Sequence, residues 1–237
     1  MDIISADASL DGYRLVIAPA LVILTPDRVR HLTEFVERGG NLVLTIRSGM
    51  KDQFNSLLPQ RQPGDLSALT NAEVEEYYPL ETPVPVVGKS VNGESRLWAE
   101  RLRILDTTQF TQVVARYGKE NGWLDDQVAI TVTPKKYGTA FVYYVGAYLD
   151  ETAQSALMNL ILTASEIRPS LETPHGMEVC QRVSPAGEKI YILINHRKEP
   201  QKLILPWKAQ EHLSDTTIQG ELDLSAYGVA ILTREPA

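Results

Sequence analysis

The chain has 237 residues, of which 43% are hydrophobic and 22% are charged, as in ordinary globular proteins. That length is enough to bury a core in one large domain or in each of two smaller ones. The formal net charge of −7 gives no general attraction for nucleic acid or for an anionic membrane, so neither is expected as a partner.

The first elements predicted along the chain form a β-α-β unit. Residues 13–18, YRLVIA, are a nearly continuous apolar run, which suits a strand covered on both faces in a parallel sheet. The next helix is predicted to begin with Thr25 as N-cap and Pro26 at its first position, and to end at a Gly-Gly pair. The strand NLVLTI follows, and this order implies a right-handed parallel crossover.

Strand patterns dominate the middle of the chain. Residues 81–88, ETPVPVVG, are proline-rich and are expected to leave the sheet edge. Trp98 is expected to lie in a strand with its side chain in the hydrophobic core. Asp150 is expected to cap a helix that ends near residue 165. The predicted strands are residues 73–78 (EVEEYY), RLWAERLRIL, TQVVARY, QVAITVT and GTAFVYYVG.

A change of composition predicts a domain boundary near residue 167. Residues 166–176 contain two prolines and a glycine without helical period, and they are interpreted as a linker. From residue 177 onward, short strand patterns alternate with turn residues. The sequence therefore predicts an α/β domain over 1–167 and a small antiparallel β-sandwich domain over 168–237.

The turn after the second strand, TIRSGMKDQFN, is the principal candidate site, because loops that follow parallel strands often bind ligands. It gathers Arg47, Ser48, Lys51, Asp52 and Asn55. Ser48 lacks the framing glycines of a nucleophile elbow. We interpret the turn as a contact with another chain or a sugar. The alternative is that these side chains only cap the turn and the next helix.

Other candidates for chemistry are weaker. Trp123 lies in the polar loop ENGWLDD and is predicted to be an exposed aromatic contact. Cys180 is the only cysteine, so an internal disulfide and a thiolate metal cluster are excluded, and it is expected to be a small buried hydrophobe. Neither a metal nor a cofactor is expected. The N-terminus shows no signal peptide and no apolar run of about 18 residues occurs, which suggests a cytoplasmic protein.

The order of several segments resembles the glycoside hydrolase family 42 β-galactosidases. The run from DGYRLVIAPAL to RSGMKDQFN resembles the middle domain of that family. VEEYYPL, GTAFVYYVGAYLD and GELDLSAYGVAIL follow in the family's order, the last in its small C-terminal β-domain. The resemblance covers nearly the whole chain.

This resemblance implies a flavodoxin-like or class I glutamine amidotransferase-like parallel-sheet domain that forms homotrimers, followed by the small β-domain. It also implies that the catalytic barrel lies outside these 237 residues, so no catalytic residue is assigned. The family's first strand and helix have no counterpart before residue 2. We therefore expect that the sheet closes up, that residues 2–5 are displaced, or that another chain covers the gap.

The leading hypothesis is a non-catalytic oligomerisation or accessory fragment of a β-galactosidase-like enzyme of galactoside metabolism. By the resemblance, its partners are copies of itself, as a trimer, or a separate catalytic barrel chain. One alternative is a stand-alone carbohydrate-binding module that uses Trp123 and the β-domain. Another is an amidotransferase-like hydrolase, which is disfavoured because no cysteine follows a parallel strand.

Overall fold

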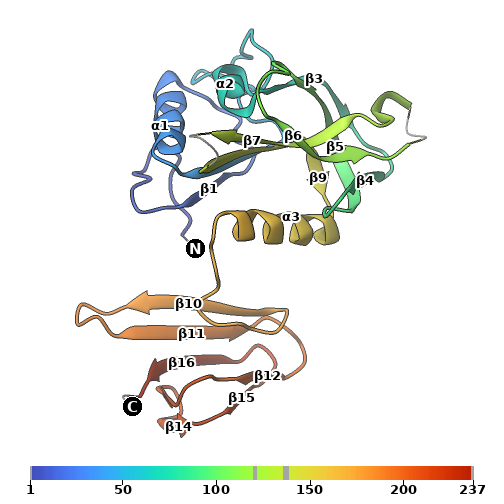
Figure 1. Ribbon diagram of the computed structural model, residues 1–237. Helices are drawn as coiled ribbons and strands as arrows, with labels where there is room; N and C mark the ends of the chain where they lie inside the picture. The colour runs from blue at the N-terminus through green and yellow to red at the C-terminus, as the bar shows by residue number, and fades with distance from the viewer. Residues whose placement is uncertain (1, 120–121, 136–138, 236–237) are drawn as a thin grey trace. The chain divides into compact units, whose positions relative to one another are not determined.

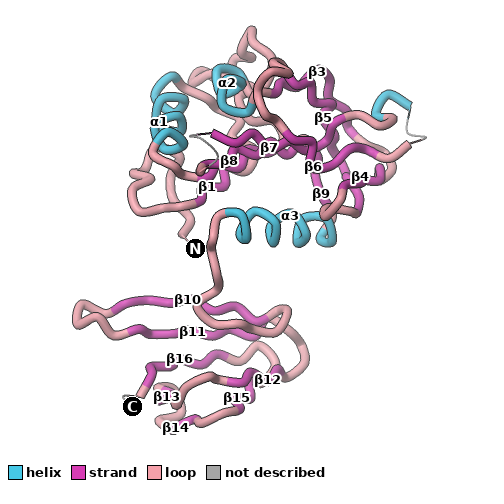
Figure 2. The backbone as a smooth tube through the Cα atoms, viewed as in Figure 1, coloured by secondary structure: helices cyan, strands magenta, loops and turns pink. Residues whose placement is uncertain are grey.

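The computed structural model describes residues 2–119, 122–135 and 139–235. These residues form two compact units, one over Ile4–Ile167 and one from Arg168 onward (Figure 1). In the described ranges every helix belongs to the first unit, and the second contains strands and loops (Figure 2). None of the described helices is long and apolar enough to cross a membrane.

The first unit is built on one mixed sheet. Its strands, within the described ranges, are β1 (Leu15–Ala18), β2 (Asn41–Thr45), β3 (Ala72–Pro79), β4 (Val84–Gly88), β5 (Gly93–Ile104), β6 (Gln112–Tyr117), β7 (Val128–Lys135), β8 (Ala140–Val145) and β9 (Ala147–Leu149). Their order is β1-β2-β8-β7-β6-β4-β5-β3, with β9 paired to β5. Only β1, β2 and β8 run parallel to one another, and the remaining pairings of these strands are antiparallel.

Two long helices pack on the sheet, one against the parallel strands β2 and β8 and the other against β5 and β9. They are α1 (Pro26–Glu37) and α3 (Glu151–Ala164), and three short helices complete the unit: η1 (Gly64–Leu66), α2 (Ser67–Thr70) and η2 (Gly122–Leu124). The predicted caps are confirmed. The Thr25 side chain accepts a hydrogen bond from the backbone of Arg28, and Asp150 accepts one from Ala153.

Both faces of strand β2 pack against a hydrophobic core. Its side chains alternate, so that Leu42 and Leu44 join a core with α1, whereas Val43 joins a core with α3. The turn from α1 into β2 is close-packed: a Cβ at Gly40 would lie 2.2 Å from the ring of Phe35. A side chain at residue 40 would therefore force that ring out of the core.

The two ends of the sheet differ from the sequence prediction. Strand β1 is an edge strand, and Ile17 in it is 41% exposed, so the expectation that this strand is covered on both faces was wrong. β1 pairs directly with β2, so no gap separates these two strands. Residues 2–5 form no strand. The proline-rich segment 81–88 was expected to leave the sheet, yet it supplies β4, which pairs with both β5 and β6.

The second unit contains two antiparallel sheets. Its strands are β10 (Met177–Val183), β11 (Lys189–Asn195), β12 (Gln201–Ile204), β13 (Ala209–Glu211), β14 (Thr216–Ile218), β15 (Glu221–Leu224) and β16 (Val229–Arg234). One sheet has the order β10-β11-β16-β13-β14, and the other consists of β12 and β15. Leucines from both sheets, among them Leu193, Leu203 and Leu222, pack in one core.

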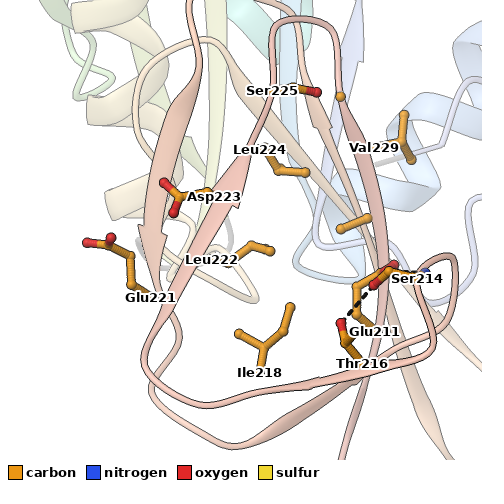
Figure 3. Close-up of a pocket in the computed structure, with 12 residues that line it drawn as sticks. Glu211, Ser214, Thr216, Ile218, Glu221, Leu222, Asp223, Leu224, Ser225 and Val229 are labelled. Atoms are coloured by element: carbon orange, nitrogen blue, oxygen red, sulfur yellow. Dashed lines mark hydrogen bonds between the residues drawn. The ribbon is translucent and has the colours of Figure 1, made fainter.

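A cleft of about 420 Å³ lies against β13 to β16 of this unit (Figure 3). Its one buried carboxylate, Glu211, accepts hydrogen bonds from the backbone N–H groups of Leu213, Ser214 and Ile231 and from the Ser214 hydroxyl. Burial alone would raise the pKa of Glu211, but these four donors outweigh it and lower the pKa to about 2. Glu211 is thus a structural link between the 211–214 turn and β16.

This link predicts an acid-sensitive second unit. Because the folded pKa of Glu211 is lowered, its ionised form stabilises the fold above the ordinary value of 4.5. We expect the free energy of unfolding to fall as pH drops from 4.5 toward about 2. Urea unfolding followed by near-ultraviolet circular dichroism would measure this fall. Glu211→Gln should flatten it, and an unchanged slope in that variant would contradict the assignment.

Candidate interaction site

The turn after β2 is held in place by its backbone. Arg47 has φ 63°, in the left-handed region. The buried hydroxyl of Ser48 donates to the carbonyl of Thr45 at 2.7 Å. Gly49 has φ 67°, and a Cβ there would lie 2.3 Å from the carbonyl oxygen of Pro63. Ser48 is therefore a structural residue, and it is not available as a nucleophile.

Three of the predicted polar residues bond within the turn itself. The Lys51 ammonium donates to the side-chain oxygen of Asn55 at 2.9 Å. One carboxylate oxygen of Asp52 accepts from the backbone N–H groups of Phe54 and Ser56, at 2.8 and 2.9 Å. These bonds are the ones expected if the side chains only cap the turn. A contact of these three side chains with another chain or a sugar stays a prediction.

Arg47 is different, because its side chain leaves the turn and lies on an aromatic ring. Its guanidinium carbon is 5.3 Å from the ring centroid of Trp98, within the range of a cation–π contact. Trp98 in turn stacks on Tyr77, with centroids 5.1 Å apart and planes 14° apart. We call Arg47, Trp98 and Tyr77 the Arg47 stack. Tyr77 is 44% exposed, so the stack reaches the surface.

A fully buried carboxylate, Glu100, lies beneath the stack. Its Oε1 accepts from the backbone N–H of Arg47 at 2.8 Å and from the indole N–H of Trp98 at 3.1 Å. Its Oε2 accepts from the hydroxyl of Tyr144, on β8, at 3.0 Å. One side chain therefore joins the turn after β2 to strands β5 and β8.

Burial dominates the electrostatics of this carboxylate. Desolvation raises the pKa of Glu100, and the three hydrogen bonds together with the charge of Arg47 only partly offset that effect. Burial and the neighbouring Glu100 also raise the pKa of Tyr144 well above its ordinary value. Tyr144 thus stays a protonated hydroxyl that donates to Glu100.

A β-bulge in β5 exposes an apolar side chain beside Trp98. The pairing of β5 with β9 shifts register between Ser95 and Ala99. Leu97 lies in this bulge with φ 64° and is 67% exposed. Left-handed backbone at a residue with a Cβ costs on the order of 1 kcal/mol or more and is common at functional surfaces. The bulge is fixed by hydrogen bonds from Leu80 to Leu97 and from Ser95 to Trp98, each 2.9 Å.

Sequence reasoning missed most of this cluster. Trp98 was expected in the core, but it is only half-buried because Arg47 and Tyr77 flank it at the surface. Glu100 was not singled out, and Tyr77 was considered only as one of several aromatic residues that could stack on a sugar ring. One signal was available: Trp98 and Glu100 are two residues apart on a strand, which places them on one face.

The remaining candidates lie elsewhere. Trp123 is 77% exposed and borders a pocket of about 350 Å³ that also includes Tyr78, Glu81 and Thr82. Cys180 was expected to be buried, but it is partly exposed and its thiol donates to Glu178, so that expectation was wrong. Among the described residues, no group of three or more His, Cys, Asp or Glu side chains could hold a metal ion.

Two family models match the chain. The β-galactosidase trimerisation domain matches residues 1–168, and the β-galactosidase C-terminal domain matches residues 176–234. The chain therefore belongs to the family of glycoside hydrolase family 42 β-galactosidases, by its middle and C-terminal domains.

Individual relatives agree with this membership. The chain is 29% identical to the β-galactosidase BgaA of Clostridium cellulovorans over 98% of its own length, and 29% identical to BglY of Alicyclobacillus acidocaldarius over 99%. It spans only 34% of each of these relatives. The crystal structure of a β-galactosidase from Bacillus circulans sp. alkalophilus superposes with a TM-score of 0.87 at 25% identity, over 99% of this chain and 35% of that one.

The geometry of Glu100 predicts that stability falls as the pH rises from acidic values. Because its folded pKa is raised, the unfolded chain releases this proton first. The free energy of unfolding should therefore fall as pH rises past the ordinary glutamate pKa of 4.5. Glu100→Gln keeps the acceptor for Arg47 and Trp98 and should remove this fall.

A second variant tests the hydrogen bonds that Glu100 accepts. Glu100→Ala leaves three donors without their acceptor and should cost about 3 kcal/mol or more. Urea unfolding across pH would measure both variants. A Glu100→Ala protein as stable as wild type, or a Glu100→Gln protein with the wild-type pH dependence, would contradict this role of Glu100.

Proposed function

We propose that the chain is a non-catalytic oligomerisation and accessory part of a β-galactosidase-like glycoside hydrolase, acting in galactoside metabolism. Its partners are further copies of itself, as a trimer, or a separate catalytic barrel chain. The observation that carries this proposal is the match of both domains, in order, to β-galactosidases over nearly the whole chain. The Arg47 stack supports it, because Arg, Trp and Tyr are the residues enriched at the energetic centres of protein interfaces.

Three finer points belong to the same proposal. The parallel part of the sheet, with its β-α-β crossover, supports a flavodoxin-like or amidotransferase-like origin of the first domain. We place the two domains at 1–167 and 168–237, and the protein in the cytoplasm. The amidotransferase-like hydrolase has no such support: Ser48 is buried, and Cys180 lies in an antiparallel strand.

Self-association and the lack of turnover are measurable together. Sedimentation equilibrium of the isolated chain at micromolar concentration should give a mass that rises above one copy toward three. A chromogenic β-galactoside should not be hydrolysed, because no catalytic residue is assigned to this chain. A monomer at every concentration would count against the oligomerisation role, and robust turnover would overturn the non-catalytic assignment.

A second candidate function is favoured by Trp123. A tryptophan face that is 77% exposed, next to the carboxylate of Glu81 and the hydroxyl of Thr82, is a surface on which a sugar ring can stack. If the chain is a carbohydrate-binding module, calorimetry with lactose or galactose should show saturable heat that Trp123→Ala removes. Silent titrations of the wild-type chain would eliminate this candidate.

A further inference from the structure

We propose that the Arg47 stack, together with Leu97, is the surface through which this chain binds a second copy of itself, and that Arg47 receives a carboxylate of that copy. This inference rests on the proposed oligomerisation role and deepens it by naming the surface and the chemistry of its partner.

The guanidinium of Arg47 has donors that no described group uses. Its side chain is exposed, and within the described ranges its guanidinium makes no hydrogen bond and no ion pair, although its backbone N–H is bonded to Glu100. A guanidinium presents five donors in a planar fork that matches a carboxylate in two parallel hydrogen bonds. The stack therefore offers a site whose chemical counterpart is an aspartate or a glutamate.

This guanidinium is already held in position before a partner binds. Trp98 lies against it at 5.3 Å, Tyr77 supports Trp98, and Glu100 holds both the Arg47 backbone and the Trp98 indole. Ordering a long side chain on association ordinarily costs about 0.5–1.5 kcal/mol. A side chain that is ordered before association avoids much of that cost, which favours a tight contact.

An exposed apolar side chain precedes Trp98 in the chain. Leu97 is 67% exposed in a strained bulge adjacent to Trp98. A partner that covers both Leu97 and the stack would bury this apolar side chain and exclude water from the ion pair of Arg47, and this strengthens the pair. A small free carboxylate such as acetate would leave Leu97 uncovered, so the surface fits a protein.

Charge complementarity selects a second copy as that protein. The chain has 30 acidic and 23 basic side chains, so each copy carries seven carboxylates more than its own lysines and arginines can neutralise. Arg47 meets a carboxylate from a different part of the next copy, which makes a head-to-tail contact. Such contacts close into a ring when the rotation between copies is one third of a turn, as a trimer requires.

The test compares self-association of matched variants by sedimentation equilibrium. Arg47→Gln should raise the dissociation constant at least about tenfold, the size of a modest interface hot spot. Arg47→Lys should give an intermediate loss, because it keeps the charge but not the fork. Arg30→Gln is the control: Arg30 is exposed on α1, outside the stack, and its loss changes net charge equally.

Folding is checked separately: Arg47→Gln leaves the backbone bond to Glu100 in place but removes the cation–π contact, so it should still unfold cooperatively in urea and lose only about 0.5–1 kcal/mol. Added salt should weaken wild-type association more than that of Arg47→Gln. Wild-type association that Arg47→Gln and Arg30→Gln affect equally would overturn this inference while leaving the oligomerisation role intact. A monomeric wild-type chain would overturn both. Arg47-dependent binding to a family 42 catalytic barrel, with unchanged self-association, would replace the second copy by that partner.

Discussion

The arrangement of the first unit depends on one buried carboxylate. Glu100 is fully enclosed, and an enclosed carboxylate is tolerated only when donors converge on it. Those donors come from three places in the chain: the turn after β2, the indole of Trp98 and the hydroxyl of Tyr144. The hydrogen bonds to this carboxylate therefore hold strand β5, strand β8 and the turn after β2 in fixed positions relative to one another.

The same constraint explains where the interaction site lies. Arg47 belongs to the parallel part of the sheet, and Trp98 and Tyr77 belong to the antiparallel β5 and β3. The site therefore combines residues from the parallel and the antiparallel parts of the mixed sheet. In a purely parallel sheet, crossover connections would be needed between the strands, and the adjacent antiparallel strands β3 and β5 that carry Tyr77 and Trp98 would be absent.

Local patterns predicted most of the helices and strands, because they are set by neighbours in sequence. The caps at Thr25 and Asp150 were predicted in this way. The position of β1 at the edge and the inclusion of β4 were not, since strand order depends on contacts distant in sequence. The candidate turn was located from sequence, but its aromatic and acidic partners were not. Glu100 lies 53 residues further along the chain than Arg47, and like Trp98 and Tyr77 it reaches the turn only through pairing in the folded sheet.

The way in which Glu100 holds the turn bears on how this surface can evolve. The carboxylate binds the backbone N–H of residue 47, which every residue except proline provides. A mutation that exchanges the side chain at this position therefore keeps this hydrogen bond, and a residue that tolerates the left-handed φ of 63° leaves the fold intact while it changes what the surface recognises. Descendants of this chain could acquire new partners through single codon changes there, whereas Glu100 itself has far less freedom to vary.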